Sequence, residues 1–187
     1  MNLKIPTIET ERLILDSFNI HDLNDIYKYC SNPNVANFTT WLPHKSLEDS
    51  KAYLKFIESS HSNEEGKVYI IWAIRKKSDN KVIGSFDFHQ IEKNIARVDY
   101  ALSENEWGQG IMTECAKAVL SWAVHKFPEI AVFTSGGLSE NRASLRVMKK
   151  CGMTFKKTEM IFFEKFNLKK EVSTYEITRN QFLNFIR

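Results

Sequence analysis

The spacing of apolar residues changes several times along the chain, and each change predicts a switch between strand and helix. Runs rich in β-branched and aromatic residues predict strands, whereas apolar positions three and four residues apart predict helices. Strands are expected at 12–18, 68–74, 82–88, 96–102, 130–134, 155–163 and 172–177. Helices are expected at 20–31, 47–58, 111–126 and 144–150.

Polar residues and prolines mark where these elements begin and end. Asn19 can cap the first helix, and the pair Asn32-Pro33 should stop it. Ser46 and Asp49 have the spacing of a capping box before the second helix. A polar turn at 76–81 joins two strands as a hairpin, so the middle of the chain is expected to be an antiparallel meander.

The order of the elements predicts a mixed α/β fold in one domain that spans residues 1–187. A chain of this length is sufficient for one sizeable core and too short for two ordinary domains. Antiparallel meanders should flank a β-α-β-α centre.

Composition and charge argue against several classes of function. The 26 Lys and Arg against 23 Asp and Glu give a net charge of only +3, and no nucleic-acid-binding motif is present, so no nucleic-acid partner is expected. Neither a signal peptide nor a membrane span is recognised. The three cysteines lack zinc-site or disulfide spacing, which favours a reducing cytoplasm. The five scattered histidines predict no metal site, and both a monomer and a homodimer remain open.

Glycine is scarce, with seven in the chain, so Gly108 and Gly110 are expected to serve a backbone purpose. They stand just before the longest predicted helix, where backbone N–H groups can bind phosphate oxygens. The spacing lacks the third Gly of a dinucleotide loop and the Lys-Ser or Lys-Thr of a nucleotide-triphosphate loop. A phosphate site and a plain tight turn are the two interpretations.

Two segments decide between them. Segment 107–114, Trp-Gly-Gln-Gly-Ile-Met-Thr-Glu, closely resembles the pyrophosphate loop of the GNAT superfamily of N-acetyltransferases, and more narrowly its RimJ/RimL branch, which acetylates protein N-termini. Segment 140–153 resembles the Asn-x-x-Ser motif of that branch, although Met153 replaces a Phe. The resemblance implies the GNAT fold, a single twisted and mostly antiparallel sheet of six to seven strands flanked by about four helices.

The resemblance also implies acetyl-CoA as co-substrate. Backbone amides of the loop would hold the pyrophosphate, the strand edge before it would pair with the pantetheine arm, and a side-chain amide would contact the arm. These residues are Gly108, Gln109, Gly110, Ile111, Met112 and Thr113, then Tyr100, Ala101 and Leu102, and finally Asn141. Segment 146–170 carries a net charge of +6, which could meet cofactor phosphates or form a solvated basic surface.

Acetyl transfer needs a proton for the departing thiolate and a base for the amine. Position 148, where the superfamily often has a Tyr acid, is Met, so Ser144 is the predicted acid; capping of a helix start is the alternative role. Asp99 is the first candidate for the base, followed by Asp87 and His89 on the preceding strand. Glu114 is a further candidate that could instead stabilise the helix start.

The acceptor is expected to lie against the aromatic segment 38–44, with Phe38 and Trp41 lining its pocket beside His89, although both aromatics could simply be core. An α-amine needs less help from a base than a lysine does, because its pKa is nearer 7. The sequence therefore favours a ribosomal or other protein N-terminus as acceptor. A small amine such as a drug, an amino acid or a polyamine is the alternative, and a non-catalytic acyl-CoA sensor is another.

Overall fold

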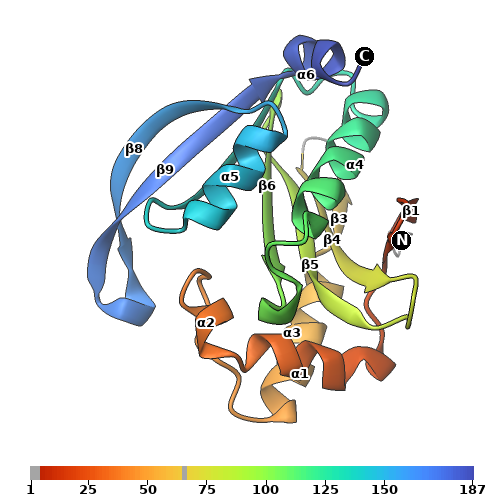
Figure 1. Ribbon diagram of the computed structural model, residues 1–187, viewed down its shortest axis with the longest axis vertical. Coiled ribbons are helices and arrows are strands. Elements are labelled where there is room, and N and C mark those ends of the chain that lie inside the picture. Colours follow the sequence, from red (N-terminus) through yellow and green to blue (C-terminus); the bar gives the residue numbers. More distant parts are fainter. Residues whose placement is uncertain (1–4, 65–66) are drawn as a thin grey trace.

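The computed structural model describes residues 5–64 and 67–187, which form one mixed sheet with helices on both faces (Figure 1). The main strands lie in the order β1-β2-β4-β5-β6-β7-β9-β8, and the short β3 also pairs with β4. The strands are β1 (Ile8–Glu9), β2 (Leu13–Asp16), β3 (Ser62–Glu64), β4 (Lys67–Lys76), β5 (Val82–Glu92), β6 (Ile95–Leu102), β7 (Val132–Leu138), β8 (Thr154–Phe163) and β9 (Leu168–Thr178).

The described chain has six α-helices and three short 3-10 turns. The helices are α1 (Leu23–Cys30), α2 (Pro33–Ala36), α3 (Leu47–Ser60), α4 (Ile111–Lys126), α5 (Arg142–Lys150) and α6 (Arg179–Phe185). The 3-10 turns are η1 (Ile20–Asp22), η2 (Glu104–Glu106) and η3 (Glu164–Phe166). Among these helices, none combines the length and the apolar character that crossing a bilayer requires.

The mixed α/β architecture and the predicted meander are confirmed. β4, β5 and β6 are successive antiparallel neighbours, and β6 and β7 are parallel because α4 connects them. The sheet has more strands than the six to seven expected, because β1 and β3 are only two and three residues long and leave no apolar pattern. The capping box of Ser46 and Asp49 is present at the start of α3.

The structure has two more helices than the four expected, namely α2 at Pro33 and α6 near the C-terminus. The pair Asn32-Pro33 does end α1, but Asn32 then caps α2, in which Pro33 is the first residue. Proline suits that position because its missing N–H would have no helical partner there. A four-residue helix is too short to show periodicity in the sequence.

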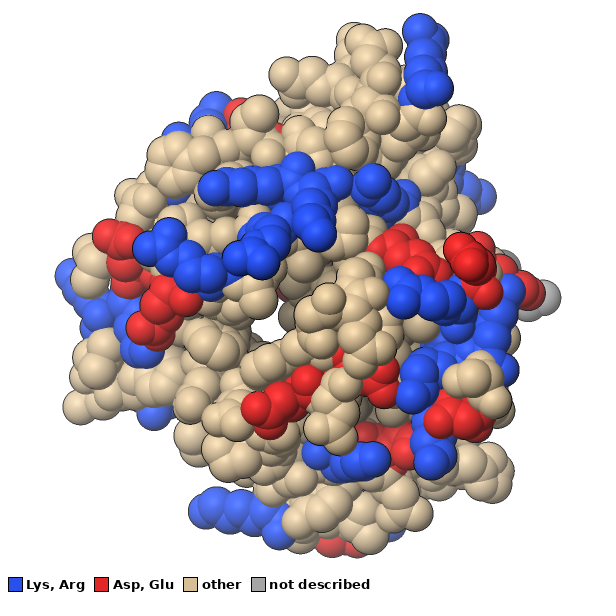
Figure 2. Space-filling model, viewed as in Figure 1, with Lys and Arg blue, Asp and Glu red and all other residues tan. Residues whose placement is uncertain are grey.

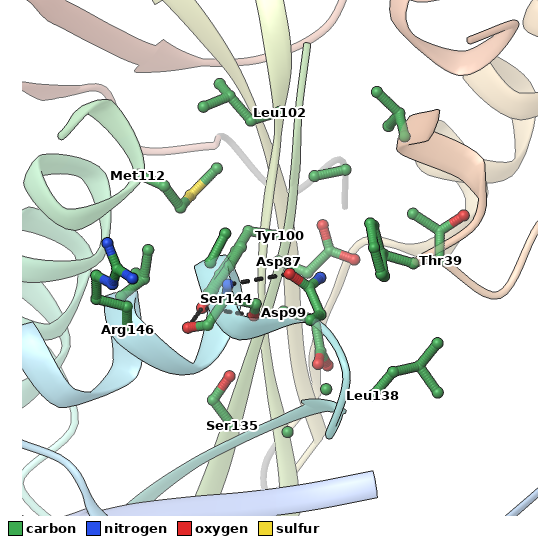
Figure 3. Close-up of a pocket in the computed structure, with 18 of the residues that line it drawn as sticks. Thr39, Asp87, Asp99, Tyr100, Leu102, Met112, Ser135, Leu138, Ser144 and Arg146 are labelled. Carbon is green, nitrogen blue, oxygen red and sulfur yellow. Dashed lines mark hydrogen bonds between the residues drawn. The ribbon is translucent and has the colours of Figure 1, made fainter. Parts of the chain in front are cut away.

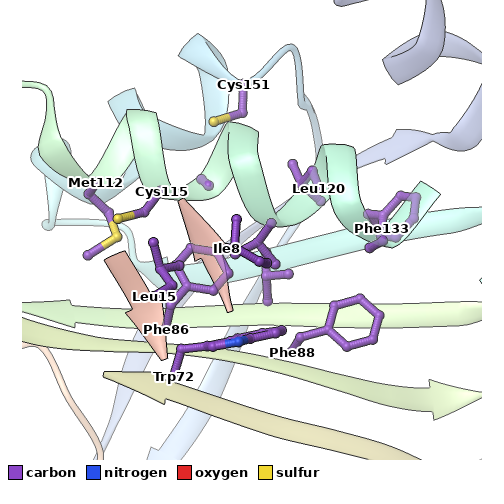
Figure 4. Close-up of a cluster of buried hydrophobic side chains, with 14 of the residues drawn as sticks. Ile8, Leu15, Trp72, Phe86, Phe88, Met112, Cys115, Leu120, Phe133 and Cys151 are labelled. Atoms are coloured by element: carbon purple, nitrogen blue, oxygen red, sulfur yellow. The ribbon is translucent and has the colours of Figure 1, made fainter. Parts of the chain in front are cut away.

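Two apolar cores lie on opposite faces of the sheet. Helix α4 packs on the first face through Cys115 and Leu120, above Trp72, Phe86 and Phe88 (Figure 4). Helices α1 and α3 cover the second face through a cluster that contains Ile26, Tyr29, Leu54, Ile57 and Ile71. Alternate residues of β4 and β5 therefore belong to different cores.

The sheet opens between β6 and β7. These strands are paired only at Ile95–Arg97 with Val132–Thr134. Beyond that point β6 continues beside β5 as far as Leu102, while β7 continues beside β9 as far as Leu138. The two strand ends diverge, and the gap between them gives access from one face of the sheet to the other.

Candidate active site

A cavity of about 900 Å³ occupies the gap between the diverging strands. Its walls come from β5, β6 and β7, from the loop before α4, from the start of α5, from the segment around α2, and from the β8–β9 hairpin. Figure 2 shows the molecule hollowed between α5 and α2. Both faces of the sheet therefore contribute to one cavity.

The loop before α4 presents free backbone N–H groups to this cavity. Gly108 and Gly110 have φ angles of +77° and +78°, a region that favours glycine. The first backbone bond of the helix runs from the Glu114 N–H to the Gly110 carbonyl, so the amides before Glu114 have no helical acceptor. The indole Nε1 of Trp107 donates to the Leu102 carbonyl at 2.8 Å and ties the loop to β6.

Glu114 links the start of α4, next to this loop, to the segment before β2. One carboxylate oxygen accepts from the Thr10 hydroxyl at 2.5 Å, and the other accepts from Arg12 Nε at 2.7 Å. Arg12 also donates to the Gln109 carbonyl at 3.1 Å. Burial acts to raise the pKa of Glu114, but the bonds from Thr10 and Arg12 outweigh it and the net shift is downward. Glu114 does not line the cavity, so its contacts are those of a structural residue.

Ser144 lies at the start of α5 with its hydroxyl 3.1 Å from the hydroxyl of Tyr100 (Figure 3). Asn141 caps α5 through its side-chain oxygen, which accepts from the Ser144 N–H at 3.1 Å, so the Ser144 hydroxyl is not needed for capping. Burial raises the pKa of Tyr100 well above its usual value, although Ser144 opposes the shift. Tyr100 therefore keeps its proton at neutral pH.

A cluster of charged and polar side chains faces the cavity from the opposite side of the sheet. Asp87 on β5 lies directly across from Asp99 on β6, and His89 lies across from Arg97. Arg97 Nε donates to Asp99 at 2.8 Å, so Asp99 faces the cavity with its charge balanced. Burial, with a further contribution from Asp99, raises the pKa of Asp87 well above its usual range. Burial lowers the pKa of His89, although Asp99 opposes this shift.

Aromatic rings form the wall beside these carboxylates. Trp41 packs on Tyr53 with ring centroids 6.0 Å apart, and Tyr69 meets His89 edge to face at 5.3 Å. Phe38 is 39% exposed and lines the same cavity as Trp41. These rings give this side of the cavity a largely apolar boundary.

The β8–β9 hairpin reaches across to this aromatic wall. Lys165, in the turn η3, donates to the Ala36 carbonyl and to the Trp41 carbonyl, the latter at 3.1 Å. Ile161 and Phe163 on β8 line the cavity from the hairpin side. Lys165 therefore fixes the backbone of Trp41 at the edge of the cavity.

The cavity brings together every predicted site residue except Gln109, whose carbonyl instead accepts from Arg12, and the base candidate Glu114, which binds Thr10 and Arg12. The residues that line it are Phe38, Trp41, His89, Asp99, Tyr100, Ala101, Leu102, Gly108, Gly110, Ile111, Met112, Thr113, Asn141 and Ser144. The hydroxyl of Tyr100 was assigned no chemical role from the sequence. Its contact with Ser144 joins residues 44 positions apart, and no local pattern could have revealed it.

The basic segment 146–170 separates into paired and unpaired cations. Lys156, Lys157 and Lys170 each form an ion pair with a glutamate at 2.7–2.9 Å. Arg146 and Lys150 on α5 line the cavity, and Figure 2 shows Lys and Arg side chains gathered over α5. These two cations could meet ligand phosphates. Residues 5–64 and 67–187 contain no cluster of three or more His, Cys, Asp or Glu side chains that could hold a metal ion.

Comparison with known proteins places this geometry in a family. The sequence profile of the acetyltransferase (GNAT) domain matches residues 12–154. The uncharacterized protein YkkB of Bacillus subtilis (strain 168) is 26% identical over 182 residues, which cover 94% of this chain and 97% of YkkB. The uncharacterized N-acetyltransferase YoaA of the same organism is 24% identical over 151 residues, which cover 79% of this chain and 82% of YoaA.

Solved structures share the fold at lower identity. A GNAT-family acetyltransferase from Bacillus anthracis has a TM-score of 0.80 at 18% identity, covering 94% of this chain and 99% of that protein. RimL, a ribosomal L7/L12 alpha-N-protein acetyltransferase solved with coenzyme A, has a TM-score of 0.78 at 19% identity, with coverages of 92% and 98%. The spermidine N-acetyltransferase of Vibrio cholerae has a TM-score of 0.74 at 16% identity, with coverages of 94% and 100%.

Proposed function

Because this chain belongs to the GNAT family of acetyltransferases, we propose that it transfers the acetyl group of acetyl-CoA to the α-amine of a protein or peptide N-terminus, as the RimJ/RimL branch does. N-acetyltransferase activity with acetyl-CoA as donor is the property of the family. The N-terminal acceptor and the roles of individual residues are the proposal.

The donor half of the cavity fits acetyl-CoA. A Cβ added at Gly108 would meet nothing within 4 Å, so the loop is open where a pyrophosphate would approach its amides. Arg146 and Lys150 supply positive charge on the same cavity. The side-chain oxygen of Asn141 caps α5, which leaves its NH₂ group for the pantetheine arm.

One observation carries the choice of acceptor: Asp87 is the one carboxylate among the described cavity residues without a cationic partner. The other four are paired with Lys or Arg at 2.7–2.9 Å, namely Asp99 with Arg97, Glu106 with Lys76, Glu140 with Lys170, and Glu159 with Lys157. A single free carboxylate matches a single ammonium group. A polyamine would require several.

The chemistry of the amine supports the same choice. An α-amine has a pKa of about 7.7–8.0, whereas a lysine amine has a pKa of about 10.4. The α-amine therefore reaches the neutral, nucleophilic form near pH 7 with little help from a base. A carboxylate such as Asp87, close to the amine, is sufficient to accept its proton.

A polyamine acceptor is the second candidate. Five carboxylates line the cavity, and the spermidine N-acetyltransferase of Vibrio cholerae has the same fold. If the four ion pairs around the cavity opened, their carboxylates could meet further ammonium groups. The pairing of these four carboxylates argues for an N-terminal acceptor, the kind of acceptor that the name of RimL describes.

A screen of acceptors tests the proposal. Acetyl-CoA turnover is measured against short peptides that differ in the first residue, alongside spermidine, free amino acids and N-terminally blocked lysine peptides. We expect a peptide α-amine to give the highest kcat/KM. Preferential turnover of spermidine would favour the second candidate, and tight CoA binding without transfer to any amine would indicate an acyl-CoA sensor.

Ser144→Ala is expected to lower kcat for the best peptide by about 100-fold, because the departing thiolate loses its proton donor. Tyr100→Phe should lower kcat by about tenfold, since Ser144 remains but loses the hydroxyl that supports it. The double variant should be little worse than Ser144→Ala, because both residues serve one proton transfer. Unchanged turnover in Ser144→Ala would remove Ser144 from the mechanism.

A further inference from the structure

The acceptor half of the cavity is the part lined by Phe38, Trp41, Asp87, His89 and Asp99, and three of these residues each have one buried polar atom without a hydrogen-bond partner in the described chain. They are Trp41 Nε1, Asp87 Oδ1 and His89 Nδ1. Buried polar groups in native proteins are almost always paired, because an unpaired group costs roughly 1–3 kcal/mol. Their convergence on one cavity indicates that a ligand provides the missing partners.

We propose that the acceptor is bound at two points, with its amine at the carboxylate of Asp87 and the carbonyl oxygen of its first residue at the indole N–H of Trp41. This inference rests on the proposed function, because it assumes an amine acceptor with a carbonyl group next to the amine. It makes Trp41 a residue that determines acceptor specificity.

The positions of the two groups support their joint use. Trp41 packs on Tyr53, and Asp87 is close enough to Tyr53 to contribute, after burial, to the raised pKa of that phenol. Lys165 donates a hydrogen bond to the Trp41 carbonyl, so contacts to both its backbone and its ring hold Trp41 in place. Asp87 is fixed by the register of β5, opposite Ile71 and Asp99.

The hydrogen-bonding character of each group selects the chemistry of its partner. The indole N–H only donates, so its partner must be an acceptor such as a carbonyl oxygen. The Asp87 carboxylate accepts, so its partner must be a donor such as an amine. In a peptide, the amine and the first carbonyl are separated by one carbon atom.

A free amino acid fits this site less well than a peptide does. Its carboxylate would lie near Asp87 and Asp99, and like charges in a buried site repel strongly. Arg97, which lines this part of the cavity, is already bonded to Asp99. The first carbonyl of a peptide is neutral and avoids this repulsion.

A pair of matched acceptors tests the proposal. The first is the best peptide from the screen, and the second is its analogue with the first amide replaced by an (E)-alkene, which keeps the shape and the amine but lacks the carbonyl. Because the alkene also makes the amine more basic, kcat/KM is compared per neutral amine. The wild-type protein should use the alkene analogue roughly tenfold less well in kcat/KM, as expected for one lost hydrogen bond.

Trp41→Phe keeps an aromatic ring and removes the N–H. The variant should lose roughly tenfold in kcat/KM with the peptide and less than about twofold with the alkene analogue. Asp87→Asn should lower kcat/KM for both acceptors equally, because both carry the amine. The KM for acetyl-CoA should not change in Trp41→Phe, which controls for the donor half of the cavity.

Two outcomes would overturn the inference while leaving the proposed function intact. One is equal loss for both acceptors in Trp41→Phe, which would make Trp41 a packing residue. The other is equal use of both acceptors by the wild-type protein. If no peptide is acetylated although CoA binds, the proposed function fails, and the inference fails with it.

Discussion

Replacing Asp87 with Asn should raise the stability of this protein at pH 7 while lowering kcat/KM by about 100-fold, because the amine loses both its hydrogen-bond partner and its proton acceptor. Asp87 is partly buried, its Oδ1 atom is fully buried without a hydrogen-bond partner in the described chain, and it lies across from a second carboxylate, Asp99. Its charge is unfavourable in the folded state and useful only when an amine is bound. Asn removes the charge at nearly the same volume, so the free energy of unfolding should rise by about 1–2 kcal/mol.

The pH dependence of this gain gives a sharper test. Burial and Asp99 raise the folded-state pKa of Asp87 above its unfolded value, so the charge lowers stability once the pH exceeds the unfolded pKa of about 3.9. This loss of folding stability is complete when the pH is above the folded-state pKa of Asp87 and absent when the pH is below its unfolded-state pKa. Asp87→Asn should therefore stabilise the protein at pH 7 and have little effect below about pH 4.

The groups that face Asp87 do not alter this expectation near neutral pH. Tyr53 on α3 and Tyr69 on β4 have raised pKa values, mainly through burial, and stay neutral. Burial lowers the pKa of His89, which therefore stays neutral near pH 7, and Asp99 is bonded to Arg97.

Urea unfolding of the wild-type protein and Asp87→Asn between pH 4 and pH 7 measures the effect. The exposed Glu129→Gln serves as a control that also removes one negative charge, and it should leave stability unchanged. A loss of stability in Asp87→Asn at pH 7 would contradict the expectation, because it would mean that the charged carboxylate has a favourable partner.

Gly84→Ala is expected to cost about 3 kcal/mol of folding stability and to weaken acetyl-CoA binding at the same time. A Cβ at Gly84 would lie 2.2 Å from the Ala101 carbonyl oxygen, a backbone atom that cannot move without shifting β6. The displaced residues, Tyr100 to Leu102, form the strand edge proposed to pair with the pantetheine arm. Urea unfolding and calorimetric titration with CoA measure the two effects.

Gly137→Ala provides the matched control, since Gly137 also lies in a strand beside the cavity. Its nearest contact for an added Cβ is the Ser144 hydroxyl at 3.4 Å, an ordinary separation from a side chain that can rotate. Its unfolding free energy should change by less than about 1 kcal/mol. Equal destabilisation by both substitutions would show that the β5–β6 contact is not special.

The sequence predicted those features of the fold that depend on residues close together in the chain. Alternating and helical spacing predicted the meander and the long helix α4, and the glycine pair predicted the tight loop at Gly108 and Gly110. Such patterns extend over a few residues and survive in the fold because local backbone preference and burial agree there.

The features of the site that could not be predicted depend on contacts between segments that are distant in the chain. Asp99 and Asp87 were both candidates for the base, and their different environments result from the bond between Arg97 and Asp99. Charge pairing of this kind is set by side-chain direction and by the neighbouring strand. The support of Ser144 by Tyr100 likewise requires α5 to pack beside β6.

Asp99 and Tyr100 are adjacent in β6 and point to opposite faces of the sheet, so one strand supplies side chains to both the proposed acceptor half and the proposed donor half of the cavity. The preference for an acceptor can therefore diverge through substitutions on one face without disturbing the donor site. A one-residue slip of β6 would exchange the two faces and destroy both halves together. Substitutions of side chains on the acceptor face are therefore tolerated, whereas a change in the register of β6 is not.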